Sequence, residues 1–157
     1  MDRTRAAAFT DRASWIGTGL AGVAVLRLAL HVASNMKQAD PAENSLGALA
    51  RVGGGFANAG LMHGLLLIAA VTLLSLPALF DRDDLVPRRT GSGLGLVLGA
   101  ALVGLIGSAV ALLTQSTLAD ALGTRVTLGT TGEMLAALAL SVVALGATMR
   151  ALRSYDE

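Results

Sequence analysis

The sequence contains no cysteine, and this absence excludes several kinds of chemistry at once. Disulfides, thiolate nucleophiles, iron–sulfur clusters and cysteine-ligated zinc all require that residue. Aromatic residues make up only 3% of the chain, so there is little surface on which nucleobases could stack. The formal net charge is +1, which does not provide the basic surface that nucleic acids require. We therefore expect no nucleic-acid partner.

Charge is also scarce, at 15% of the residues, whereas 54% are hydrophobic and the mean hydropathy is +0.65. Four apolar stretches separate the charged clusters: Ser14 to Ser34, Phe56 to Phe80, Gly93 to Thr114 and Thr130 to Met149. Each stretch has about the 20 residues that a helix needs to cross a hydrocarbon core of about 30 Å. Because backbone groups in lipid must be hydrogen-bonded internally, the stretches should be helices. The sequence predicts an all-α, polytopic membrane protein, with residues 1–157 forming a single transmembrane domain.

The basic residues are distributed unequally between the two sides of such a bundle. The flanks on the side of the termini hold Arg3, Arg5, Arg12, Arg82, Arg88, Arg89, Arg150 and Arg153, and the other side holds Lys37, Arg51 and Arg125. The positive-inside rule therefore predicts that both termini are cytoplasmic, in a cell (inner or plasma) membrane. The first apolar stretch is longer than the 7–15 residues of a signal-peptide core, so we expect it to be retained.

Small residues recur at four-residue spacing in the predicted helices, which allows helix backbones to approach closely in lipid. We assign Gly60, Gly64, Gly95, Gly99, Gly104 and Gly107 to helix packing. The same glycines could instead form the floor of a binding groove or a homo-oligomer interface. Because a bundle this small has difficulty shielding its polar groups, we expect a homo-oligomer or a subunit of a larger membrane complex, in contact with the lipid bilayer.

Polar residues interrupt the apolar stretches near the predicted external side. Arg27, His31 and Asn35 follow one another at four-residue steps, so they should form one stripe on the first helix. An ionisable residue at membrane depth is costly and indicates a functional site. The candidate polar site in the external half comprises Arg27, His31, Asn35, Asn58, His63 and Glu133. Since Arg27 needs a counter-ion, an Arg27–Glu133 ion pair is the leading hypothesis for its neutralisation.

Several functions fit this constellation. Titrating histidines and a cation-binding Glu133 in an external vestibule would suit a small transporter or an ion-pathway component. A structural ion pair, or polar residues facing a partner, would suit a non-catalytic assembly subunit of a larger membrane complex. A further alternative is an electron-transfer subunit with His31 and His63 as axial ligands of haem b. No hydrolase or phosphate-binding motif is present, so we assign no catalytic residue and no metal site.

Overall fold

Four long helices dominate the computed structural model, which describes residues 3–38, 44–79, 89–121, 125 and 127–156. They are α1 (Arg3–Met36), α2 (Ser45–Leu74), α4 (Arg89–Leu113) and α6 (Leu128–Asp156), with two short helices, α3 (Leu76–Leu79) and α5 (Gln115–Ala121). Each long helix is apolar enough and long enough to cross a membrane. The predicted all-α architecture with four candidate membrane spans is therefore confirmed.

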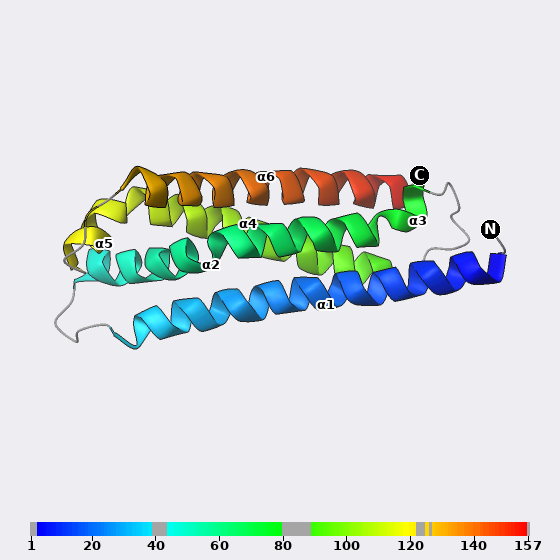
Figure 1. Cartoon of the computed structure of the whole chain (residues 1–157), viewed down its shortest axis with the longest axis horizontal. Helices are drawn as coiled ribbons and strands as arrows, with labels where there is room; N and C mark the ends of the chain where they lie inside the picture. The colour runs from blue at the N-terminus through cyan, green and yellow to red at the C-terminus, as the bar shows by residue number, and fades with distance from the viewer. Residues whose placement is uncertain (1–2, 39–43, 80–88, 122–124, 126, 157) are drawn as a thin grey trace.

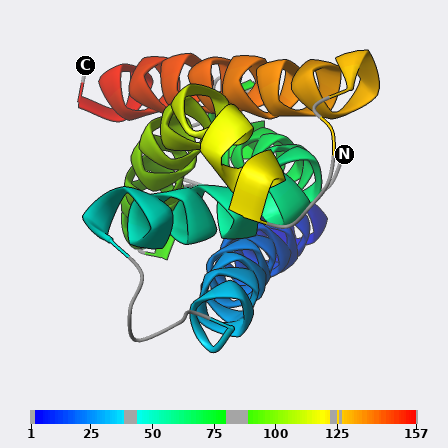
Figure 2. The ribbon, with the colours of Figure 1, turned by 90° about the vertical axis from the view of Figure 1, so that its left-hand side faces the viewer.

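The four long helices lie side by side along the long axis, and both termini lie at the same end of the bundle (Figure 1). In the end-on view, α1 and α6 lie on opposite sides, with α2 and α4 between them (Figure 2). The contacts agree with this view, because α2 packs against α1, α4 and α6, and α4 packs against α1 and α6. Within the described residues, α1 and α6 make no substantial contact.

The ends of α2 differ from those expected from hydropathy. The helix begins at Ser45, where the Asn44 side chain caps it by accepting a hydrogen bond of 2.8 Å from the Gly47 backbone N–H. It ends at Leu74, six residues before the predicted end, and one turn of α3 follows. Proline has no N–H, and its ring clashes with the carbonyl four residues earlier, so Pro77 prevents α2 from continuing.

Glycines on α2 bring this helix unusually close to two neighbours. A Cβ atom at Gly55 would lie 2.6 Å from the Cα of Val32 on α1, and one at Gly64 would lie 2.6 Å from the Cβ of Leu140 on α6. Ordinary carbon–carbon contacts are about 3.5–4.0 Å, so a methyl group does not fit at either position. Lipid provides no hydrophobic driving force between helices. The van der Waals contacts that such a close backbone approach allows therefore help to hold the helices together.

Polar contacts join the helices at the end that carries the termini. The Arg89 guanidinium of α4 lies 3.9 Å from the centroid of the Trp15 ring and 3.7 Å from a carboxylate oxygen of Asp11, both on α1. The Tyr155 hydroxyl of α6 donates a hydrogen bond of 2.9 Å to the Leu74 carbonyl at the end of α2. These contacts fix α1 to α4 and α6 to α2. The side of the membrane on which this end lies stays a prediction.

Candidate intramembrane polar site

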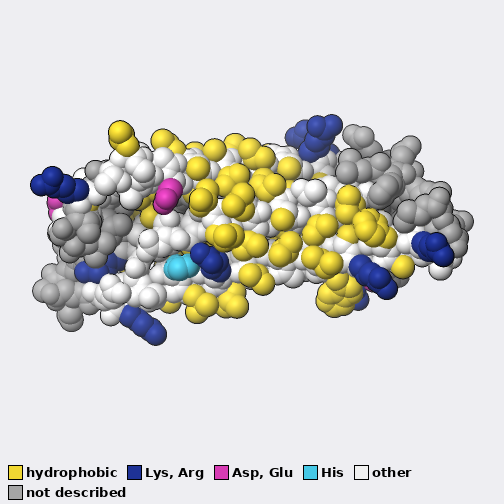
Figure 3. Space-filling view, in the orientation of Figure 1, with side chains coloured by type: hydrophobic (Ala, Val, Ile, Leu, Met, Phe, Trp, Pro, Cys, Tyr) yellow, Lys and Arg dark blue, Asp and Glu magenta, His cyan; other side chains and the backbone are white. Residues whose placement is uncertain are grey.

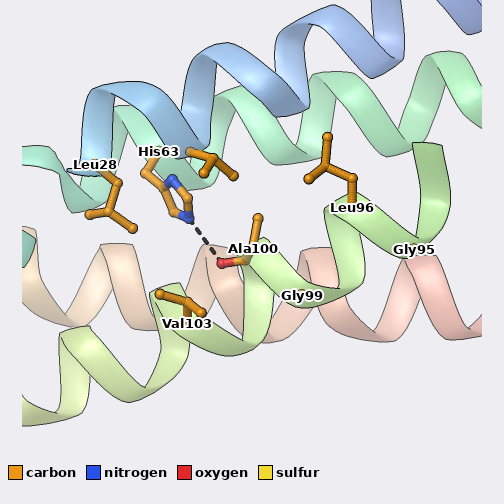
Figure 4. Close-up of a pocket in the computed structure, with 8 residues that line it drawn as sticks. Leu28, His63, Gly95, Leu96, Gly99, Ala100 and Val103 are labelled. Carbon is orange, nitrogen blue, oxygen red and sulfur yellow. Dashed lines mark hydrogen bonds between the residues drawn. The ribbon is translucent and has the colours of Figure 1, made fainter. Parts of the chain in front are cut away.

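His63 of α2 lies in the middle of the bundle, with only 1% of its surface exposed. Its Nδ1 is 3.2 Å from the Ala24 carbonyl oxygen of α1, and its Nε2 is 3.0 Å from the Ala100 carbonyl oxygen of α4. Figure 4 shows the ring directed at α4, with the second contact drawn as a dashed line. A neutral imidazole has one N–H and donates to one of these carbonyls, whereas a doubly protonated ring donates to both. Either form ties α2 to a neighbouring helix.

The ring of His63 fits because α4 has a glycine opposite it. A Cβ atom at Gly104 would lie 2.9 Å from Cδ2 and 3.0 Å from Nε2 of His63. Gly107 has a similar role one turn along α4, where the Phe56 ring occupies the space of a side chain. Two of the glycines assigned to packing on α4 therefore accommodate rings from α2.

Gly95 and Gly99 behave differently from the other glycines assigned to packing. A Cβ atom at either position would have no atom of another helix within 4 Å, so the structure does not place them at a helix contact in this chain. They line a cavity of about 270 Å³ beside His63, between α1 and α4. Its other lining residues are Val25, Leu28, Leu96, Ala100 and Val103 (Figure 4). Apart from His63, every residue lining the cavity is apolar or glycine.

Arg27 and His31 lie on an outer surface of α1. Together with Val23, Leu26, Leu30 and Ser34, they line a shallow hollow of about 430 Å³ to which only α1 contributes. The Nε atom of Arg27 is buried but has no hydrogen-bond partner. Asn35, the last residue of the predicted stripe, lies one turn further along and is half-buried.

The structure does not bring Arg27 and Glu133 together, and no ion pair joins them among the described residues. Glu133 is exposed near the start of α6, and Asn58 is exposed on α2. The predicted ion pair within the chain is not formed because α2 lies between α1 and α6.

The two charged residues nevertheless lie at similar heights in the bundle. His63 of α2 contacts Ala24 of α1, and three residues earlier on α2 a Cβ atom at Gly60 would lie 2.8 Å from the Cβ of Ala137 on α6. α1 and α2 run in opposite directions, so a position three residues after Ala24 on α1 is level with a position three residues before His63 on α2. Arg27 is therefore at the height of Gly60, and Ala137, which lies against Gly60, is at that height too. Glu133 is four residues from Ala137, which corresponds to an axial offset of about 6 Å at 1.5 Å per residue.

The two histidines do not face a common space. His63 lines the cavity between α1 and α4, whereas His31 lines the hollow on α1. One haem requires its two axial histidines on opposite faces of the same ring system, so this arrangement does not support the haem b hypothesis. Among the described residues, no three histidine or acidic side chains come together as a metal site.

Sequence reasoning missed two features of the bundle, one at His63 and one at the end that carries the termini. The carbonyl partners of His63 are backbone atoms of alanines, which no sequence pattern distinguishes from other alanines. The contacts of Arg89 with Trp15 and Asp11 were also not anticipated, although a basic residue and an aromatic residue on the same side of the membrane could have suggested them.

No protein-family model, curated protein or solved structure matches this chain. Its function therefore has to be inferred from the positions and contacts of its own residues.

Proposed function

We propose that this protein is a non-catalytic subunit of a membrane assembly and that its outward-facing polar side chains bind transmembrane helices of neighbouring subunits. The observation that carries this proposal is the position of Arg27 and Glu133. Arg27 lies on an outer surface of α1, Glu133 is exposed on α6, and the two do not pair within the chain.

Arg27 lies among exposed apolar side chains of α1. Leu26 and Leu30, which flank Arg27 in its hollow, are 61% and 63% exposed. Figure 3 shows hydrophobic side chains over the middle of the molecule, where lipid would surround the bundle. A charged side chain at the centre of a membrane helix costs about 2.5–3.5 kcal/mol on insertion scales. A neighbouring helix that supplies the opposite charge would offset this cost, which favours a role in assembly.

The bundle interior gives less support to a transport pathway. Ser141 and Thr148, which are buried on α6, donate to carbonyls of their own helix at 3.0 and 2.7 Å. Both ring nitrogens of His63 already face carbonyl oxygens. An ion pathway needs polar groups that are free to bind ions or water, and among the described residues only the Thr18 hydroxyl and the Arg27 Nε are buried without a hydrogen-bond partner. Assembly therefore agrees better with the interior than coupled transport does.

The test is the native mass of the protein extracted from its membrane in a mild detergent. We expect the wild-type chain in a complex larger than one copy, and we expect Arg27→Ala and Glu133→Gln to release single chains. Arg153→Ala is the matched control, because Arg153 is exposed in the last turn of α6, at the end with the termini. Its complex should keep the wild-type mass. A wild-type protein that is always a single chain without partners would overturn the proposal.

A further inference from the structure

The geometry points to a second copy of this chain as the partner, an inference that rests on the assembly role proposed above. In the proposed dimer, a two-fold axis parallel to the membrane normal passes beside α2. Arg27 of each copy then pairs with Glu133 of the other, and the two Asn58 side chains meet near the axis.

Charge complementarity supports a copy of the same chain. The chain presents a cation and an anion on the membrane-spanning part of its outer surface, Arg27 on α1 and Glu133 on α6, and α2 separates them within one copy. Their axial offset is about 6 Å. The flexible aliphatic part of the arginine side chain can lie along apolar surface over that distance while the guanidinium reaches the carboxylate of a partner. A charged pair of this kind forms a stronger hydrogen bond than neutral groups do.

The positions of α1 and α6 fit a two-fold axis. α2 packs against α1, α4 and α6, so its exposed side chains occupy the remaining side, between α1 and α6. On the face drawn in Figure 3, a basic side chain and a histidine lie over α1 and an acidic side chain lies over α6. A rotation of 180° about an axis beside α2 keeps every height and exchanges the two sides. Each α1 then faces the partner's α6, and a single self-complementary interface contains two ion pairs.

The exposed surface of α2 suits the centre of this interface. Asn58 lies two residues from Gly60, so its height is between those of Arg27 and Glu133. Leu61, Met62 and Leu65 follow it and are 42%, 44% and 47% exposed. In the dimer, these apolar side chains pack around an Asn58 pair that is hydrogen-bonded across the axis, as polar residues of membrane helices often are.

Single-cysteine variants test this arrangement cleanly because the chain has no cysteine of its own. Mild oxidation of membranes should convert Asn58→Cys into a disulfide-linked dimer. Ile106→Cys is the matched control, because Ile106 is 63% exposed on α4, on another face of the bundle. It should remain monomeric on a denaturing gel. Efficient cross-linking of Ile106→Cys without cross-linking of Asn58→Cys would overturn the proposed interface.

Charge reversal tests the ion pairs. In vesicles of neutral phosphatidylcholine, Arg27→Glu or Glu133→Arg alone should weaken dimerisation measured by energy transfer between labelled copies at least tenfold. Each reversal places like charges opposite each other. The double variant restores opposite charges and should recover dimerisation, which also shows that the variants fold. Failure of the double variant to recover it would overturn the pairing.

The native mass separates the failure of this inference from the failure of the proposed function. A complex with a different protein would retain the assembly role and overturn the dimer. A single chain without partners would overturn both. A single chain whose Arg27 and His31 hold anionic lipid, seen as loss of bound phosphatidylglycerol in Arg27→Ala, would also overturn both.

Discussion

Replacing Gly64 with alanine tests the close contact between α2 and α6. The added Cβ would lie 2.6 Å from the Cβ of Leu140 and 3.1 Å from its Cδ1. Since carbon atoms pack at about 3.5–4.0 Å, the two helices would have to separate locally by about 1 Å. The Cβ of Leu140 is fixed to its backbone, so a change of rotamer cannot relieve the overlap.

The size of the effect follows from two opposing contributions. Overpacking a well-packed interior costs about 1–3 kcal/mol. Alanine is favoured over glycine in a helix by about 1 kcal/mol, which offsets part of this cost. Gly99→Ala on α4 is the matched control, because its added Cβ would meet no atom of another helix within 4 Å. The propensity gain is common to both variants, so Gly64→Ala should be less stable than Gly99→Ala by about 1–3 kcal/mol, or about 5- to 150-fold in the unfolding equilibrium.

The measurement is reversible unfolding in mixed micelles, with helix content followed as the fraction of denaturing detergent rises. Gly99→Ala should unfold at the same detergent fraction as the wild type or at a higher one, and Gly64→Ala at a lower one. Equal stability of the two alanine variants would refute the argument that Gly64 is required for the approach of α2 to α6.

Two further predictions use the same unfolding assay. His63→Leu removes the ring contacts with the Ala24 and Ala100 carbonyls and should destabilise the bundle by about 0.6–1.2 kcal/mol, because the ring donates one or two interhelical hydrogen bonds and such bonds in membranes average about 0.6 kcal/mol each. His63→Gln keeps one donor and should be intermediate, and a leucine variant as stable as the wild type would contradict this role. Asn44→Ala removes the cap that accepts from the Gly47 N–H and should cost about 1 kcal/mol, whereas Asn44→Ser should keep most of the stability. Equal losses in both variants would contradict the capping role.

The architecture could be predicted from the sequence because lipid restricts the choices so strongly. A stretch of about 20 apolar residues must satisfy its backbone hydrogen bonds internally, and this requirement alone indicates a helix. The helix ends were less predictable, because the Asn44 side chain caps the start of α2 at Ser45 and Pro77 ends the helix by a steric effect. Hydropathy measures neither of these local interactions.

The lateral arrangement of the helices could not be predicted from the sequence. The sequence placed Arg27 and Glu133 in the same half of the bundle, but a shared height does not say which helices are neighbours. That choice depends on close contacts such as Gly55 with Val32 and Gly64 with Leu140, which become visible only when the helices are packed. The predicted Arg27–Glu133 ion pair within the chain is therefore wrong because α2 separates α1 from α6, although the two residues lie at similar heights.

The packing of α2 links the stability of the bundle to its surface charge. Its glycines let α1 and α6 approach from two sides, so α2 occupies the space in which the Arg27 and Glu133 side chains would otherwise meet. Closer packing within one copy thus leaves both charges on the outside. If α1 and α6 were adjacent, the ion pair would close within the chain and no partner would be needed. With α2 between them, a partner that supplies the missing counter-ions lowers the free energy of keeping both charges in the membrane. In the proposed dimer, the contacts that stabilise the single chain would therefore also favour its association.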